Sequence, residues 1–275
     1  MTSGWSGPQT PLATPCETIT RTPRNGFQAG RRATIGLDTV RRLCLKVLGL
    51  IGGMSWESTA VYYRRLNEIV HERLGGLHSA KIVLYSVDFH EIEEGMRAGR
   101  WDDVGAALGG AARALETAGA EIVVMTTNTL HKVAPAVEAA VRIPLLHIVD
   151  PTAEAIGRAR FAKVGLLGTR FTMEQEFYRE RLRRHGLEVI VPGDADREIV
   201  HRVIFDELCL GKVLPASRTE YRRVMAGLAD EGAEALILGC TEIAMLVGPE
   251  DASVPLFDTT ELHVRAAVGW ALAAG

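Results

Sequence analysis

Cys240 is placed where a thiol could do acid–base or nucleophilic chemistry. It lies between an apolar run and a predicted helix start, with Gly239 before it and Thr241 and Glu242 after it. A cysteine at the amino end of a helix can have a lowered pKa, which makes a thiolate available near neutral pH. The alternative is a buried cysteine that packs as a small hydrophobe. The polar flanks favour a functional thiol.

An internal repeat gives Cys240 a counterpart. Three segments recur in the same order, offset by 111 to 117 residues: 46–53 with 163–168, 119–124 with 232–237, and 142–146 with 253–257. Eight residues after Gly119 stands Thr127, and eight residues after Gly232 stands Cys240. Two copies are too few for a solenoid and instead predict two similar lobes. We therefore expect Thr127 and Cys240 at equivalent places, one in each lobe.

From Lys46 onward, short apolar runs alternate with longer amphipathic stretches. Continuous apolar runs of this length are typical of parallel strands that are covered on both faces, and the alternation predicts an α/β fold. The expected architecture is two pseudo-symmetric doubly wound lobes, with mostly parallel sheets and a cleft between them. The predicted strands are 47–51, 81–86, 122–125, 145–148, 164–167, 188–191, 236–238 and 256–257, and the predicted helices are 56–74, 102–118, 173–184 and 221–230.

The lobes are assigned by residue range. The first is expected to comprise residues 45–149 plus 259–275, and the second residues 150–258. Residues 1–44 differ from the rest because they are rich in Pro, Thr and Arg and lack a periodic apolar pattern. We interpret them as a disordered or over-extended amino terminus, with a transit peptide as the alternative.

Composition excludes several classes of function. The 275 residues are 47% apolar and 24% charged, with a net charge of −3 and a pI near 6.3, which gives no electrostatic case for nucleic acid or an anionic membrane. No apolar run approaches the roughly 20 residues of a bilayer span. The four cysteines form no CxxC or metal-ligand pattern, so we expect reduced thiols, a cytoplasmic location and no metal.

Small polar residues follow four of the predicted strands, at the edge where parallel sheets bind ligands. Each of these turns leads into a helix, so its backbone N–H groups can hold an anion such as a carboxylate. Two facing lobes would bring the turns together in one cleft. The residues predicted to bind substrate there are Gly53, Met54, Ser55, Asn128, Thr129, Thr169, Thr241 and Glu242.

Other titratable residues have less certain roles. His131 follows the Thr127 turn and is either a proton relay or a histidine on a helix flank. Glu242 is either a carboxylate at a helix amino terminus or a proton relay. Cys209 lies in an apolar helical stretch and is expected to pack as a small hydrophobe, while His90 and His147 are interpreted as structural or capping residues.

From Lys46 to the end, the chain resembles the aspartate/glutamate racemase superfamily. The motifs that carry the resemblance are Gly52-Gly53-Met54-Ser55, Thr127-Asn128-Thr129-Leu130-His131 and Gly239-Cys240-Thr241-Glu242. Longer matches at 52–59, 86–94 and 167–175 are most similar to a bacterial branch of broad-specificity amino-acid racemases. The resemblance implies a homodimer and catalysis without pyridoxal phosphate, in which one thiol removes the Cα proton and a second thiol returns a proton to the opposite face.

The sequence departs from the superfamily pattern at two points. Thr127 stands where the superfamily usually has the second cysteine, as it also does in the broad-specificity branch, so symmetric two-thiol chemistry is not expected. The Lys and Arg that hold the distal carboxylate in aspartate racemases have no clear match. The Lys position falls at or near Cys209, and the Arg region reads Asp88-Phe89-His90-Glu91.

The leading hypothesis is an amino-acid racemase without a cofactor. Cys240 is the main acid/base, Thr127 faces the opposite side, and the substrate is Asp, Glu or another polar amino acid. One alternative is a single-thiol decarboxylase or isomerase of the same superfamily. The other is an amino-acid-binding protein without catalytic activity.

Overall fold

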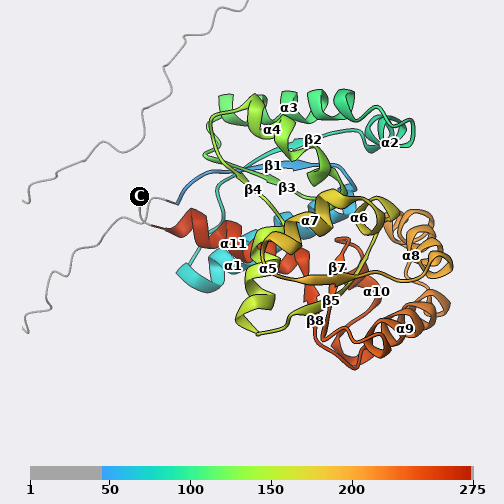
Figure 1. The fold of residues 1–275 in the computed structure, drawn as a ribbon. Coiled ribbons are helices and arrows are strands. Elements are labelled where there is room, and N and C mark those ends of the chain that lie inside the picture. Colours follow the sequence, from blue (N-terminus) through green and yellow to red (C-terminus); the bar gives the residue numbers. More distant parts are fainter. Residues whose placement is uncertain (1–44, 274–275) are drawn as a thin grey trace, which may run out of the picture. The chain divides into compact units, whose positions relative to one another are not determined.

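The computed structural model describes residues 45–273, in which the strands form two separate four-stranded parallel sheets (Figure 1). The first sheet has the order β2-β1-β3-β4 and the second the order β6-β5-β7-β8. The predicted α/β class with two similar lobes is therefore confirmed, whereas the predictions for residues 1–44 lie outside the described residues. The strands are β1 Leu48–Gly52, β2 Ile82–Ser86, β3 Ile122–Met125, β4 Leu145–Leu146, β5 Lys163–Gly168, β6 Glu188–Ile190, β7 Ala235–Gly239 and β8 Leu256–Asp258.

Helices follow the strands in alternation, as parallel crossovers require. The α-helices are α1 Trp56–Leu74, α2 Phe89–Arg97, α3 Trp101–Thr117, α4 Ala134–Ala140, α5 Val149–Arg158, α6 Arg170–Glu174, α7 Glu176–Arg184, α8 Asp194–Asp206, α9 Pro215–Asp230, α10 Ile243–Leu246 and α11 Thr259–Leu272. Short 3₁₀ helices are η1 Thr129–Val133, η2 Leu208–Leu210 and η3 Pro249–Asp251. None of the helices within residues 45–273 combines the length and the apolar character that a bilayer span needs.

The first sheet is buried on both faces because its strands alternate apolar side chains between two cores. In β3, Ile122 and Val124 pack with α1 and α11, while Val123 and Met125 pack with α2, α3 and α4. Figure 1 shows α3 and α4 above this sheet and α1 and α11 below it. The carboxyl ends of β1 and β3 are therefore held rigidly side by side.

The second sheet repeats this arrangement. In β7, Leu236 and Leu238 pack with α8 and α9, and Ala235 and Ile237 pack with α5 and α7. The register pairs Gly168 at the end of β5 with Gly239 at the end of β7. The turns after these two strands consequently start at the same height.

One predicted helix is divided. The stretch 173–184 was expected to be continuous, but α6 ends at Glu174 and α7 begins at Glu176, because Gln175 adopts an extended backbone with φ −87° and ψ 146°. An Arg179 Nη2 donor bonds the Glu174 carbonyl across the break at 2.9 Å. This break turns α7 so that Tyr178 enters the core.

Candidate active site

The turns after β1, β3, β5 and β7 surround one cavity between the two sheets. The cavity is small, with a volume of about 20 Å³. Thr127 lines it from the first lobe and Cys240 from the second, together with the predicted binding residues Met54, Asn128, Thr129, Thr169, Thr241 and Glu242. The structure thus brings together residues that lie up to 188 positions apart in the sequence.

Glu242 is the centre of the hydrogen bonding in this cavity. Its buried carboxylate accepts bonds from the Cys240 thiol at 2.9 Å and from the Thr241 hydroxyl at 2.6 Å, both to Oε2. The other oxygen, Oε1, accepts a 2.7 Å bond from the Ser55 hydroxyl of the first lobe. Glu242 therefore joins the candidate acid/base to the opposite lobe.

The environment of Cys240 contradicts the expected thiolate. Burial, followed by the charge of Glu242, raises the pKa of the Cys240 thiol well above its usual value. A backbone N–H of Glu242 lowers it, as a helix terminus should, but this effect is smaller. Cys240 is accordingly a protonated thiol bonded to a carboxylate.

The first turn acts through its backbone. Gly53 has φ +90°, and a Cβ at this position would lie 2.2 Å from the Val87 carbonyl oxygen, so only glycine fits. Its N–H donates to Thr59 Oγ1 at 2.8 Å. Gly53 and Ser55 are not part of the cavity lining; Ser55 instead caps α1 through Ser58 N and reaches Glu242.

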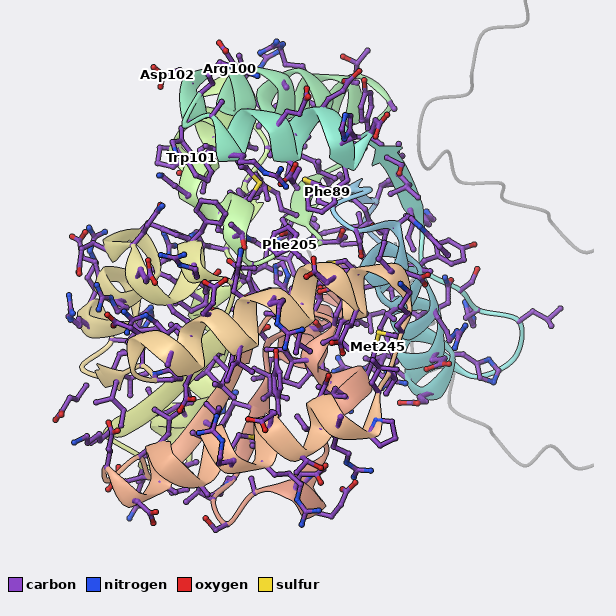
Figure 2. All side chains as sticks on the ribbon, turned by 90° about the vertical axis from the view of Figure 1, so that its right-hand side faces the viewer. Phe89, Arg100, Trp101, Asp102, Phe205 and Met245 are labelled. Atoms are coloured by element: carbon purple, nitrogen blue, oxygen red, sulfur yellow. The ribbon has the colours of Figure 1, made fainter. Side chains whose placement is uncertain are left out.

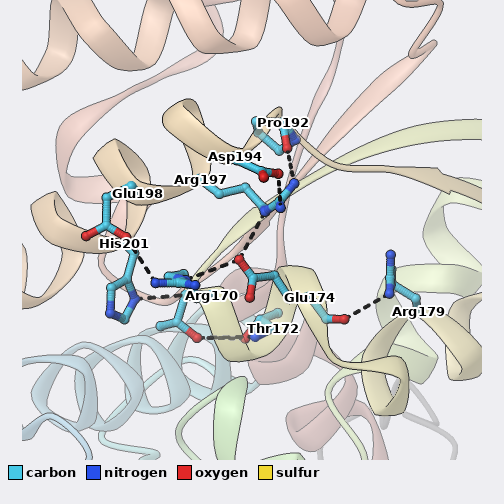
Figure 3. Close-up of polar contacts among 10 residues, drawn as sticks. Arg170, Thr172, Glu174, Arg179, Pro192, Asp194, Arg197, Glu198 and His201 are labelled. Atoms are coloured by element: carbon cyan, nitrogen blue, oxygen red, sulfur yellow. Dashed lines mark hydrogen bonds and ion pairs between the residues drawn. The ribbon is translucent and has the colours of Figure 1, made fainter.

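Hydroxyl groups connect the lobes on the β3–β5 side. Thr129 Oγ1 lies 2.9 Å from Thr169 Oγ1 and 3.2 Å from Thr172 Oγ1. Thr169 also caps α6 by accepting from Thr172 N. Figure 3 shows that α6 is tied to α8 by ion pairs, with Arg170 reaching both Glu174 and Glu198. The hydroxyl cluster therefore stands on a well-anchored helix.

Asn128 is fixed by a second buried chain of bonds between the lobes. Tyr178 of α7 donates to Asn128 Oδ1 at 2.9 Å, and Asn128 Nδ2 donates to Thr259 Oγ1 at 3.0 Å. Thr259 in turn donates to the Leu238 carbonyl at 2.8 Å. The oxygen and the nitrogen of the Asn128 side chain are thus both bonded to other residues of the protein, and these bonds orient the turn that carries Thr127.

The predicted relay residue, His131, lies elsewhere. It is buried but lines a different hollow, and the Ile148 N–H donates to its Nε2 at 3.2 Å. The proton is consequently on Nδ1, which donates to the Thr127 carbonyl at 2.7 Å. Burial lowers the pKa of His131 well below its usual value. With both ring nitrogens bonded to backbone, His131 supports the Thr127 turn and has no free nitrogen for a relay.

Of the two histidines predicted to be structural or capping, His147 agrees with that prediction, whereas His90 does not, because Asp88 is the residue that caps α2. His147 is buried, its Nδ1 accepts from Val149 N at 3.3 Å at the start of α5, and burial lowers its pKa to about 2. His90 is exposed in the first turn of α2. Neither residue lines the cavity between the sheets.

Sequence reasoning missed several residues that line the cavity. Cys209 was expected to be a packing residue in a helix, but it lies in η2 with its Sγ 3.9 Å from Glu242 Oε1. Burial raises the pKa of this thiol as well, so it is neutral. Figure 2 shows Phe89 and Phe205 facing each other from different lobes, with ring centroids 6.4 Å apart. The one signal in the sequence for this aromatic contact is that each phenylalanine stands at or next to the end of a helix.

Metal binding has no support in the part of the chain that the structure describes. Within residues 45–273, no group of three or more His, Cys, Asp or Glu side chains is arranged to hold an ion. The cavity lining itself supplies two thiols, a carboxylate and several hydroxyls.

Known proteins share both the sequence pattern and the fold. Residues 51–267 match the family model described as Asp/Glu/hydantoin racemase. The broad-specificity amino-acid racemase RacX of Bacillus subtilis is 22% identical over 233 residues, which are 82% of this chain and 99% of that protein.

Among solved structures, a candidate Asp/Glu racemase from Yersinia pestis is 57% identical, with a TM-score of 0.78 over 83% of this chain and 100% of the other. An aspartate racemase homologue from Pyrococcus horikoshii is 38% identical, with a TM-score of 0.72 over 82% of this chain and 99% of the other. A glutamate racemase from Francisella tularensis, at 16% identity and a TM-score of 0.61 over 83% and 81%, shares the fold.

Proposed function

Because the chain belongs to the Asp/Glu/hydantoin racemase family, we propose that it is an amino-acid racemase that works without pyridoxal phosphate. The observation that carries this proposal is the Cys240–Glu242 pair on one side of a cavity that Thr127 lines from the other lobe. Within residues 45–273, the cavity lining has no lysine that could form a Schiff base. The substrate proposed from the family resemblance is Asp, Glu or another polar amino acid.

The binding turns help to overcome the weak acidity of the amino-acid Cα–H. Removal of this proton leaves a carbanion whose charge spreads into the α-carboxylate, so donors fixed around that carboxylate stabilise the transition state. The Thr129 hydroxyl and the N–H groups at the strand ends supply such donors. They are held before substrate arrives, which avoids the cost of reorganising them during the reaction.

Cys240 and Glu242 form the proton-transfer unit. The thiol passes its proton to the Glu242 carboxylate, to which it is already bonded at 2.9 Å, and the resulting thiolate removes the Cα proton. Because the thiol pKa is raised, the thiolate is scarce but strongly basic, which suits a very weak carbon acid. The carbanion then takes a proton from the Thr127 hydroxyl on the other face. Water returns a proton to Thr127, and the hydroxide left behind takes the proton that Glu242 had received, so every group regains its starting state.

Cys240→Ala tests the assignment. Incubation of the full-length protein with L- and D-amino acids in D₂O, followed by NMR and chiral chromatography, should show that the variant loses nearly all Cα deuteration. Cys209→Ala is the matched control, because it removes the neighbouring thiol but leaves Cys240 and Glu242, and it should retain measurable exchange. If Cys240→Ala kept exchange at the wild-type rate, the assignment would be wrong.

One thiol and one hydroxyl should also make the two faces unequal. For the enantiomer whose Cα–H faces Cys240, deuterium should enter faster than the centre inverts, because return by the same thiol competes with the slow Thr127 side. The equilibrium constant between two enantiomers is one, so kcat/KM must be equal for the L and D substrates. The difference between the two faces therefore appears as different kcat values, with KM values that differ by the same factor. Equal kcat values for L and D substrates would argue for two equivalent acid/bases.

A second function is favoured by the protonated state of Cys240. A neutral thiol is ready to protonate an enolate from one face, which is the step that a single-thiol decarboxylase of disubstituted malonates requires. Release of CO₂ from such a malonate, with no Cα deuteration of any amino acid, would establish that alternative. Binding of an amino acid with neither reaction would indicate a protein without catalytic activity. A homodimer and a cytoplasmic location remain predictions from sequence.

A further inference from the structure

The charged side chain that lines the cavity between the sheets is negative. Among its lining residues, all of which lie within the described range, Glu242 is the one Asp, Glu, Lys, Arg or His. Its carboxylate is buried, and all its donors are neutral: the Ser55 and Thr241 hydroxyls and the Cys240 and Cys209 thiols. A buried carboxylate of this kind is stabilised most by a cation that arrives with the ligand.

The end of the cavity next to Cys209 is apolar. Phe89 and Met96 of α2 face Ile204 and Phe205 of α8, and the two phenylalanine rings are stacked with an interplanar angle of 14° (Figure 2). A wall of this composition gains free energy from contact with hydrocarbon and offers no partner to a charge.

Two arginines of α6 and α8 pair with carboxylates and do not line the cavity. Figure 3 shows Arg170 bonded to Glu174 and Glu198, and Arg197 bonded to Glu174 and Asp194. Neither arginine is part of the cavity lining. Their charges are already matched by carboxylates, so they do not provide the cation that a distal carboxylate would need.

Taking the proposed racemase activity as given, the geometry points to a substrate whose side chain is uncharged. The α-ammonium pairs with Glu242, the α-carboxylate is held at the strand ends, and the side chain lies against Phe89, Phe205 and Cys209. A second carboxylate, as in Asp or Glu, would be buried without a cation and would repel Glu242. A cationic side chain would also lack a partner, because Glu242 already holds the ammonium.

Matched amino acids test the inference with the full-length protein. Initial rates of Cα deuteration in D₂O near neutral pH are compared for Gln against Glu, for Asn against Asp, and for Met against Lys. We expect kcat/KM for the best uncharged member to exceed that for Glu, Asp and Lys by on the order of 100-fold or more. Comparable or higher values for Glu, Asp or Lys would overturn the inference while leaving the racemase intact. Absence of exchange with every member would overturn the proposed function and the inference with it.

Discussion

Removal of the Tyr178 hydroxyl should weaken both the fold and the active site. Tyr178→Phe deletes the 2.9 Å bond to Asn128 Oδ1 and leaves that oxygen buried without its donor. An unsatisfied buried acceptor costs about 1–3 kcal/mol. For a domain of this size, 1 kcal/mol corresponds to about 2–4 °C in Tm, so the expected loss is roughly 2–12 °C.

The same change should reach the chemistry, because Asn128 is adjacent to Thr127 and its side chain orients their shared turn. Small displacements of positioning groups reduce rates steeply, and we expect kcat/KM for Cα exchange to fall on the order of 10- to 100-fold. Circular dichroism melting and the deuteration assay measure the two effects on one preparation.

Tyr221→Phe is the matched control. Its hydroxyl is also buried and donates to the Val200 carbonyl at 3.0 Å, but this bond lies within the second lobe and Tyr221 does not line the cavity. It should lower Tm by a similar amount and leave kcat/KM close to wild type. If Tyr178→Phe melted at the wild-type temperature, or if both variants lost activity equally, the bond between the lobes would not position the site.

Three further changes have defined outcomes. Glu242→Gln keeps the shape but removes the charge that, after burial, raises the pKa of Cys240, so the pH profile of thiol alkylation should move to lower pH. Thr127→Cys should bring the kcat values for L and D substrates closer together, as measured by initial rates. Burial lowers the pKa of His263 to about 4 in the folded protein. Below about pH 6.5 this histidine therefore takes up a proton in the unfolded state but not in the folded state. The free energy of unfolding should consequently fall by roughly 2 kcal/mol between neutral pH and pH 5. Urea midpoints should show a smaller fall in His263→Gln.

The fold could be predicted because its signal is local and repeated. The run 122–125 coincides with β3, and the glycines after the helices mark ends such as Gly75. The division of 173–184 at Gln175 could not be predicted in this way, since no glycine or proline marks it. That break is a tertiary feature, in which Tyr178 enters the core and Arg179 bonds across it.

The candidate site was predictable where residues follow strand ends and unpredictable where contacts come from distant elements. Cys240 and Thr127 lie at equivalent strand ends and both reach the cavity, as the internal repeat indicates. Cys209 reaches it because α8 ends at Asp206 and the chain turns through η2, and no spacing in the sequence encodes that approach to Glu242. His131 has the right spacing for a relay, but the backbone of Thr127 and Ile148 occupies both of its ring nitrogens.

The protonation state of Cys240 shows why a motif alone can mislead. A position before a helix favours the thiolate, but α10 has only 4 residues and contributes little through its dipole. Against this weak attraction stand burial and a full carboxylate charge at 2.9 Å, and in a site with little water the full charge dominates. The backbone N–H that lowers the pKa and the carboxylate that raises it both belong to Glu242. Which of the two effects is larger depends on whether the Glu242 side chain points towards the Cys240 thiol. A substrate ammonium bound beside Glu242 would offset the carboxylate charge and so bring the pKa of Cys240 down, although burial, the larger cause, would still hold that pKa above its usual value.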